Sequence, residues 1–84
     1  MIHVVEDDAG VRELELYTLR TAGYEAAGFG EPAEFRRALQ DGLPDLVILD
    51  VMLPREDGMS LLRFLRHDAR TRRLPVILVT ARDA

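Results

Sequence analysis

The chain has 84 residues, 48% of them hydrophobic and 6% aromatic, with a formal net charge of −4 at pH 7, no cysteine, and 11 arginines but no lysine. This composition allows one domain with a small core; it excludes disulfides, a cysteine nucleophile, a P-loop and Schiff-base chemistry, and the negative charge argues against nucleic-acid binding by this domain itself. No apolar run approaches the roughly 20 residues of a membrane-spanning helix, and the chain begins with a strand-like segment in place of a signal peptide, so we expect a cytoplasmic protein without membrane contact.

The first half of the chain alternates strand-like and helix-like segments. Residues 2–5 form a short apolar run, which is typical of a buried strand. A helix is expected over residues 9–22, because apolar and small residues recur there at spacings of three and four. A short, weak strand over residues 24–28 and a helix from Pro32 to the residues before Gly42 follow. The apolar faces of the two helices are expected to consist of Val11, Leu14, Thr18 and Ala22 and of Phe35, Ala38 and Leu39.

The second half continues the same alternation. A third strand is expected over residues 46–49, a helix opening near Gly58 with Leu61, Leu62 and Leu65 as its apolar residues, and a fourth strand over residues 76–79. This order predicts an α/β fold with a parallel sheet built from right-handed βαβ units. No linker interrupts the chain, so residues 1–84 are expected to form one domain.

Acidic residues follow two of the expected strands. Glu6, Asp7 and Asp8 come after the first strand, and Asp50 follows the third. Ligands of open α/β sheets bind beyond the carboxyl ends of the strands, so we expect Glu6, Asp7 and Asp50 to meet at one edge, and Asp8 to cap the following helix. Crowded carboxylates raise one another's pKa, and a divalent cation relieves this repulsion. Mg²⁺ suits such a site best, because it prefers carboxylate oxygens, water and phosphate.

Taken together, these segments resemble the receiver domain of two-component response regulators. The matching pieces are Val4-Val5-Glu6-Asp7-Asp8, Leu46-Val47-Ile48-Leu49-Asp50, Met52-Leu53-Pro54, Asp57-Gly58 and Leu74-Pro75-Val76-Ile77-Leu78-Val79-Thr80-Ala81. Their order and spacing carry the resemblance, which covers essentially the whole chain. It implies a flavodoxin-like doubly wound sheet with strand order 2-1-3-4. Residues 1–84 would be the N-terminal portion of such a domain, truncated after the fourth strand, with the fifth strand and the last two helices missing.

The resemblance also implies a role for each acidic residue. Asp50 would accept a phosphoryl group from a sensor histidine kinase, a phosphotransfer protein or a small phosphodonor. Asp7 and Asp50 would bind Mg²⁺ directly, and Glu6 would act through a metal-bound water. The backbone carbonyl of Met52 would be a further metal ligand.

The resemblance extends to the end of the fourth strand and then stops. Thr80 would turn its hydroxyl toward the phosphoryl group, and the small Ala81 would leave room for that group. The fifth strand of the family carries a lysine that bonds the phosphoryl group, whereas this chain has no lysine. Without a fifth strand, residues 76–79 form an apolar edge strand, through which two copies of the chain could dimerise.

Two other functions stay open at this point. A degenerate receiver would act as a phosphorylation-independent interaction or dimerisation module; the missing lysine favours it, and the complete acidic set argues against it. A haloacid-dehalogenase-type phosphatase also uses an aspartate at a strand end, but it needs a second aspartate where this chain has Met52. We therefore expect a phosphoacceptor signalling domain that assists its own phosphorylation and dephosphorylation, and not an enzyme.

Overall fold

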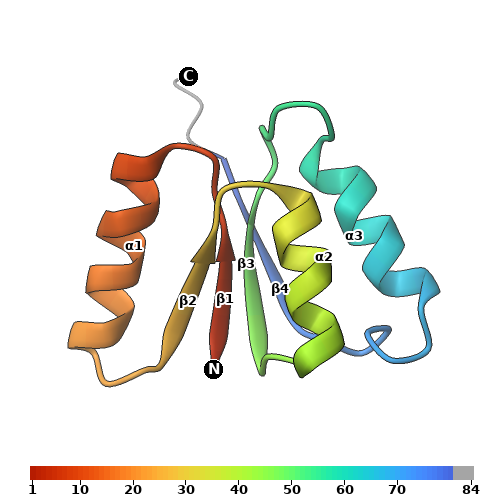
Figure 1. Ribbon diagram of the computed structural model, residues 1–84, viewed down its shortest axis with the longest axis horizontal. Helices are drawn as coiled ribbons and strands as arrows, with labels where there is room; N and C mark the ends of the chain where they lie inside the picture. The colour runs from red at the N-terminus through yellow and green to blue at the C-terminus, as the bar shows by residue number, and fades with distance from the viewer. Residues whose placement is uncertain (81–84) are drawn as a thin grey trace.

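The computed structural model describes residues 1–80, and its elements follow the predicted order (Figure 1). In chain order these are β1 (Ile2–Val5), α1 (Ala9–Thr21), β2 (Ala26–Phe29), α2 (Pro32–Asp41), β3 (Leu46–Asp50), α3 (Gly58–His67) and β4 (Val76–Val79). All neighbouring strands are parallel, in the order β2-β1-β3-β4. The fold is therefore the flavodoxin-like α/β arrangement that the sequence predicts.

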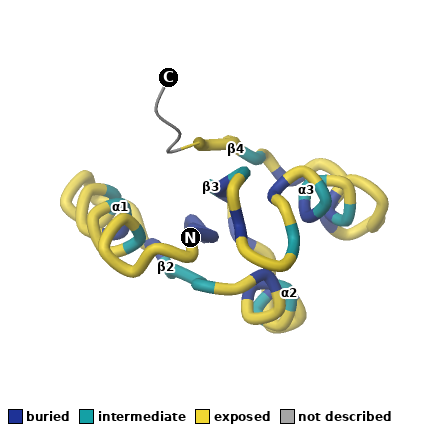
Figure 2. Tube along the Cα trace, turned by 90° about the horizontal axis from the view of Figure 1, so that it is seen from above, coloured by how far each residue is buried: buried dark blue, intermediate teal, exposed yellow. Residues whose placement is uncertain are grey.

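Helices cover both faces of the sheet, and each face has its own core. Seen from above, α1 lies on one face, and α2 and α3 lie on the other (Figure 2). The larger core lies under α2 and α3 and consists of Val5, Phe35, Leu39, Val47, Leu49, Leu53, Leu61, Leu65 and Leu74. The smaller core lies under α1 and consists of Ile2, Val4, Leu16 and Ala26. None of the helices in residues 1–80 is long and apolar enough to cross a membrane.

Helix α1 turns a different face to the sheet from the one expected, so that prediction was wrong. Leu16 is its buried residue, whereas Val11 and Leu14 are 37% and 65% exposed. The positions one turn before and after Leu16 are Arg12 and Leu19, which are half-buried. A polar residue at a sheet-facing position breaks the apolar period, so the neighbouring stripe gave the stronger sequence signal.

Strand β2 begins two residues later than expected. The backbone of Gly23 has a φ of 99°, a left-handed conformation that ends α1. The N–H of Tyr24 then donates to the carbonyl oxygen of Leu19, which keeps this residue in the helix terminus. Pairing with β1 starts only at Ala26, opposite Ile2.

The predicted cap of α1 and the helix start near Gly58 agree with the structure, and so do most of the residues expected on the buried faces of α2 and α3. Asp8 accepts a hydrogen bond from the backbone N–H of Val11 at 2.9 Å, and Asp57 accepts one from Ser60 at 2.7 Å, so each caps a helix. Of the residues expected on the sheet-facing sides of α2 and α3, Phe35, Leu39, Leu61 and Leu65 are buried, and Ala38 and Leu62 are half-buried. Residues of β1 and β3, the two central strands, pack in one core with these buried residues of α2 and α3.

Strand β4 is an edge strand with exposed apolar side chains. Ile77, Leu78 and Val79 are 51%, 39% and 38% exposed. Within residues 1–80, β3 is the strand that pairs with β4, and no strand pairs with its other side. The apolar edge predicted from the sequence is thus present.

Candidate metal and phosphoacceptor site

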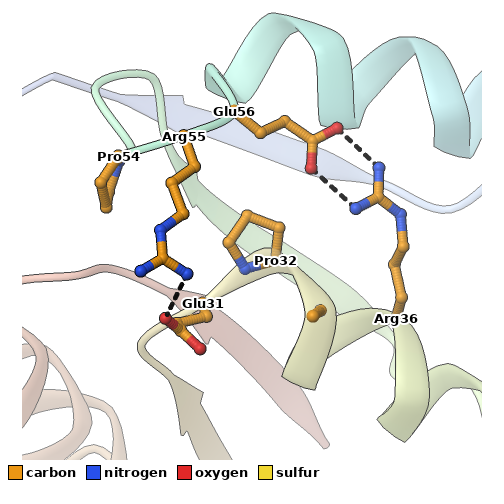
Figure 3. A pocket seen from close by; sticks show the side chains of 7 residues that line it. Glu31, Pro32, Arg36, Pro54, Arg55 and Glu56 are labelled. Carbon is orange, nitrogen blue, oxygen red and sulfur yellow. Dashed lines mark hydrogen bonds and ion pairs between the residues drawn. The ribbon is translucent and has the colours of Figure 1, made fainter.

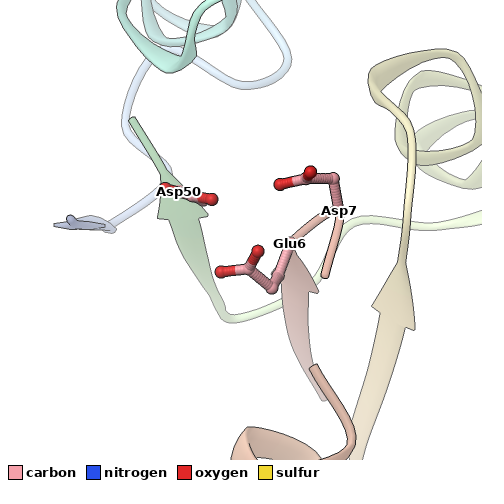
Figure 4. Close-up of side chains that lie close together, drawn as sticks. All are labelled: Glu6, Asp7 and Asp50. Carbon is pink, nitrogen blue, oxygen red and sulfur yellow. The ribbon is translucent and has the colours of Figure 1, made fainter. Parts of the chain in front are cut away.

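Three carboxylates meet where the two central strands end (Figure 4). Glu6 directly follows β1, and Asp50 is the last residue of β3; the two strands are neighbours, with Val5 opposite Leu49. One carboxylate oxygen from each of Glu6, Asp7 and Asp50 lies within 4.8 Å of the other two. The convergence predicted from the strand ends is therefore found in the structure.

The two buried carboxylates are held by backbone amides. Glu6 and Asp50 are 6% and 5% exposed, whereas Asp7 is exposed. The N–H of Asp8 donates to Oε2 of Glu6 at 3.0 Å, and the N–H of Met52 donates to Oδ1 of Asp50 at 2.9 Å. These bonds fix the orientation of both side chains at the edge of the sheet.

Burial gives Glu6 an unusual proton affinity. Desolvation raises its pKa to about 7; the amide of Asp8 acts in the opposite direction, and the nearby carboxylates of Asp50 and Asp7 raise the pKa further. Near neutral pH this carboxyl group therefore holds a proton for part of the time. A cation that binds the three carboxylates would replace that proton and remove the repulsion.

The donor set fits a hard divalent cation. Its members are carboxylate oxygens, and neither sulfur nor imidazole belongs to the cluster. The described part of the chain thus contains an acidic cluster that could hold a metal ion. The residues present fit Mg²⁺ in particular, since it is bound through one or two carboxylates together with phosphate oxygens and water.

Two further predicted site residues, Thr80 and Met52, lie close to Asp50 in the chain or in the strand register. Asp50 is opposite Val79 in the register of β3 and β4. Thr80 is the residue that follows Val79, so it comes one position past the partner of Asp50. Met52 lies two residues after Asp50, and its side chain is exposed. Ala81, the expected small residue, lies outside the described residues.

The loop from β3 to α3 is held close to Asp50. The N–H of Gly58 donates to the carbonyl oxygen of Val51 at 2.9 Å. A methyl group on Gly58 would collide with the carbonyl oxygen of Asp50 and with Cα of Val51, so this close approach requires glycine. The Asp-Gly pair of the sequence therefore sets the distance between α3 and the end of β3.

Two ion pairs tie the same loop to α2 across a pocket (Figure 3). The guanidinium of Arg36 donates to both carboxylate oxygens of Glu56, at 2.7 and 2.6 Å, and lies 4.7 Å from the centroid of the Phe64 ring. Arg55, whose φ is 67°, approaches Glu31 at 3.7 Å. The sequence did not indicate these pairs, because no short spacing links residues on α2 to residues in a distant loop.

Sequence reasoning also missed Arg12. Its guanidinium donates to the carbonyl oxygen of Glu6 at 2.8 Å and approaches that of Asp7 at 3.5 Å. The only signal for Arg12 in the sequence was its place one helical turn before the apolar residue Leu16.

The fold and this site define a domain of the doubly wound α/β class, with an acidic cluster at the ends of its central strands. The profile of the response regulator receiver domain matches residues 2–84, and the chain belongs to this family. The phosphoacceptor role of receiver domains in this family fits the acidic cluster at the strand ends.

Curated relatives are similar over nearly all of this chain. The transcriptional regulatory protein GltR of Pseudomonas aeruginosa is 44% identical over 80 residues, which are 95% of this chain and 33% of GltR. The phosphate regulon transcriptional regulatory protein PhoB of Rhizobium meliloti is 47% identical over 83 residues, which are 96% of this chain and 36% of PhoB. The chain therefore spans about a third of the length of these relatives.

Solved structures show the same fold. The N-terminal domain of a response regulator receiver protein from Methanoculleus marisnigri JR1 has a TM-score of 0.91 and 32% identity, over 99% of this chain and 68% of that one. The signal receiver domain of a signal transduction histidine kinase from Syntrophus aciditrophicus has a TM-score of 0.90 and 35% identity, over 99% of this chain and 63% of that one.

Proposed function

We propose that residues 1–84 are the N-terminal portion of a receiver domain in which Asp50 accepts a phosphoryl group. The observation that carries this proposal is the position of Asp50: it is buried at the end of a central strand, beside the carboxylates of Glu6 and Asp7. A strand end fixes the nucleophile, and positioning is most of what phosphoryl transfer requires of a protein.

The proposed metal is Mg²⁺, held by Asp7 and Asp50, with Glu6 acting through a bound water and Met52 through its backbone carbonyl. When bound, the ion neutralises charge on the transferring phosphoryl oxygens, which would otherwise be repelled by the acidic cluster. The raised pKa of Glu6 supports this assignment, since its causes are the burial of the carboxylate and the neighbouring carboxylates of Asp50 and Asp7.

The phosphoryl donor is a phosphohistidine of a sensor histidine kinase or a phosphotransfer protein, or a small phosphodonor. A carboxylate oxygen of Asp50 attacks the phosphorus atom as the P–N bond breaks, and the electron pair returns to the imidazole nitrogen. Thr80 lies one residue past the partner of Asp50 in the register, and its hydroxyl donates to the transferred group. The domain thus assists its own phosphorylation and dephosphorylation but is not an enzyme acting on other substrates.

We also propose where the domain acts and which process it serves. We assign it to the cytoplasm, where ATP supplies histidine kinases. The net charge of −4 supports the absence of nucleic-acid contact by the domain itself. GltR and PhoB are transcriptional regulators by name, which supports control of transcription as the process that this receiver serves.

A degenerate receiver that only mediates interaction is the second candidate. The exposed apolar residues of β4 favour it, because an edge of this kind pairs readily with a second chain. Under this alternative the acidic cluster would take no part in function, and Asp50 would stay unmodified.

Labelling separates the two functions. We expect acetyl phosphate with Mg²⁺ to phosphorylate the wild-type chain and not Asp50→Asn, as measured by intact-protein mass spectrometry. We expect the label to be short-lived, because the chain contains no lysine to bond the phosphoryl group. Equal labelling of the two proteins would refute the assignment of Asp50, and no labelling of either would favour the interaction module.

A further inference from the structure

Arg12 lies beneath the acidic loop and bonds its backbone. The residue is half-buried on the sheet side of α1, and its Nη1 donates to the carbonyl oxygen of Glu6 at 2.8 Å. The same nitrogen is 3.5 Å from the carbonyl oxygen of Asp7. Both acceptors are main-chain oxygens, so these bonds leave the carboxylates of Glu6 and Asp7 to a metal ion.

Two glycines at the end of β2 make room for this side chain. A Cβ atom on Gly28 would lie 3.0 Å from Cγ and Cδ of Arg12, and a Cβ atom on Gly30 would lie 3.1 Å from Nη1. At these distances a Cβ atom would require the arginine side chain to move by a few tenths of an ångström. The side chain of Arg12 therefore packs closely against two positions at the end of β2 that carry no side chain.

Arg12 completes the restraint of the residue that joins β1 to the acidic cluster. The N–H of Glu6 donates to the carbonyl oxygen of Phe29 at 3.0 Å, while its own carbonyl oxygen accepts the bond from Arg12. Both backbone groups of Glu6 are thus fixed. Its carboxylate then accepts the N–H of Asp8, at 3.0 Å, so the whole loop is ordered from the backbone outward.

We propose that Arg12 is a positioning residue of the metal site, which holds the backbone of Glu6 and Asp7 so that their carboxylates converge on Asp50. This inference rests on the proposed Mg²⁺ site. Groups that orient metal ligands without touching the metal contribute strongly to affinity, because the ion then spends less binding free energy on ordering its ligands.

Charge and geometry act in opposite directions here, which makes the inference testable. A guanidinium beside the site repels a divalent cation, so its removal by itself would tighten Mg²⁺ binding. Loss of the two carbonyl contacts instead weakens binding. Arg12→Lys keeps the charge and loses the fork of donors, so a weaker affinity in this variant would report geometry alone.

The experiment is an MgCl₂ titration of the whole 84-residue chain, followed by NMR backbone amide shifts, with thermal unfolding in EDTA as a second readout. The variants are Arg12→Gln, Arg12→Lys and Gly30→Ala. The matched control is Arg20→Gln, because Arg20 is on the same helix and also donates to a backbone carbonyl oxygen, that of Ala26, at 2.7 Å, away from the site.

We expect Arg12→Gln to raise the Kd for Mg²⁺ about 10-fold, the lower end of the range for such residues. Arg12→Lys and Gly30→Ala should raise it by smaller factors, and Arg20→Gln should leave it unchanged while lowering the melting temperature as Arg12→Gln does. If Arg12→Gln does not fold, the Mg²⁺ affinity of Gly30→Ala tests the positioning role, since this variant keeps all hydrogen-bond donors of Arg12.

An unchanged or tighter Mg²⁺ affinity in Arg12→Gln would overturn the positioning role, as would an equal loss of affinity in Arg20→Gln. A wild-type chain without any Mg²⁺ response would overturn the proposed metal site itself and this inference with it. If instead the wild type and Arg12→Gln bind Mg²⁺ equally well, the metal site stands and only the positioning role of Arg12 is overturned.

Discussion

At the scale of single residues, the burial of Glu6 links stability to pH. Its folded pKa of about 7 lies above the ordinary value of 4.5, so between these values the folded state binds a proton that the unfolded state releases. This contribution to stability is complete below pH 4.5 and is lost as the pH rises through 7. Without metal, we therefore expect the wild type to lose stability over this range relative to Glu6→Gln, whose amide does not titrate.

Thermal unfolding in EDTA, at intervals across this pH range, measures the difference between the two proteins. The difference should shrink when Mg²⁺ is added at high pH, because the cation stabilises the ionised wild type and not the amide. Parallel curves for the two proteins would contradict the raised pKa.

Which site residues the sequence could reveal depends on how they are positioned. Glu6, Asp7 and Asp50 were predicted because parallel strands end at one edge, a rule that needs only the order of the elements. Arg12 could not be predicted in this way, since its partners are main-chain oxygens whose position follows from the path of the loop. The space left by Gly30 likewise appears only in three dimensions.

At the scale of elements, the ion pair of Arg36 and Glu56 joins α2 to the loop that follows β3. The hydrogen bond from Arg36 is the main cause that lowers the pKa of Glu56. The stabilisation by this ion pair is therefore present above the ordinary pKa of a glutamate and is lost as the pH falls through the lowered pKa of Glu56. For this partly exposed bidentate pair, we expect a coupling free energy of about 1 kcal/mol at neutral pH.

A double-mutant cycle with Arg36→Gln and Glu56→Gln, followed by urea unfolding, measures this coupling. The pair of Arg55 and Glu31 is the control, because it is longer, at 3.7 Å, and its side chains are 86% and 55% exposed. Its coupling should be close to zero. Equal coupling free energies in the two cycles would show that the bidentate geometry adds nothing. A coupling free energy of Arg36 and Glu56 that does not fall in acid would contradict the lowered pKa of Glu56.

The elements themselves were mostly predictable. The order of strands and helices, the cap at Asp8, the helix start near Gly58 and most of the buried faces of α2 and α3 follow from short-range patterns. The face of α1 did not, because the polar Arg12 takes a position that faces the sheet. The start of β2 also depends on its register with β1 and not on its own residues.

At the scale of the whole molecule, the exposed edge of β4 predicts self-association of the 84-residue chain. Within residues 1–80 no strand pairs with the outer side of β4, so a second copy could cover both its backbone groups and its apolar side chains. A small domain also has little stability to spare, which favours pairing. We expect sedimentation equilibrium to show an average mass that rises with protein concentration.

Ile77→Lys should shift that equilibrium toward the monomer, because a charge on an edge strand opposes pairing. Tyr24→Lys is the matched control, since Tyr24 is a similarly exposed apolar residue, at 58% against 51%, in the turn before β2. A cooperatively unfolding wild-type monomer at high micromolar concentration would rule out association through this edge.

The central position of β1, between β2 and β3, has a consequence for the order of events during synthesis. Glu6 directly follows β1 and Asp50 ends β3; these two strands are paired in space but are separated in the chain by two helices and β2. Contacts between distant segments form slowly, because the intervening chain must first lose its freedom. On the ribosome, the acidic cluster therefore cannot assemble until β3 has emerged and paired with β1, and a nascent chain that ends before Asp50 carries the acidic loop without its partner.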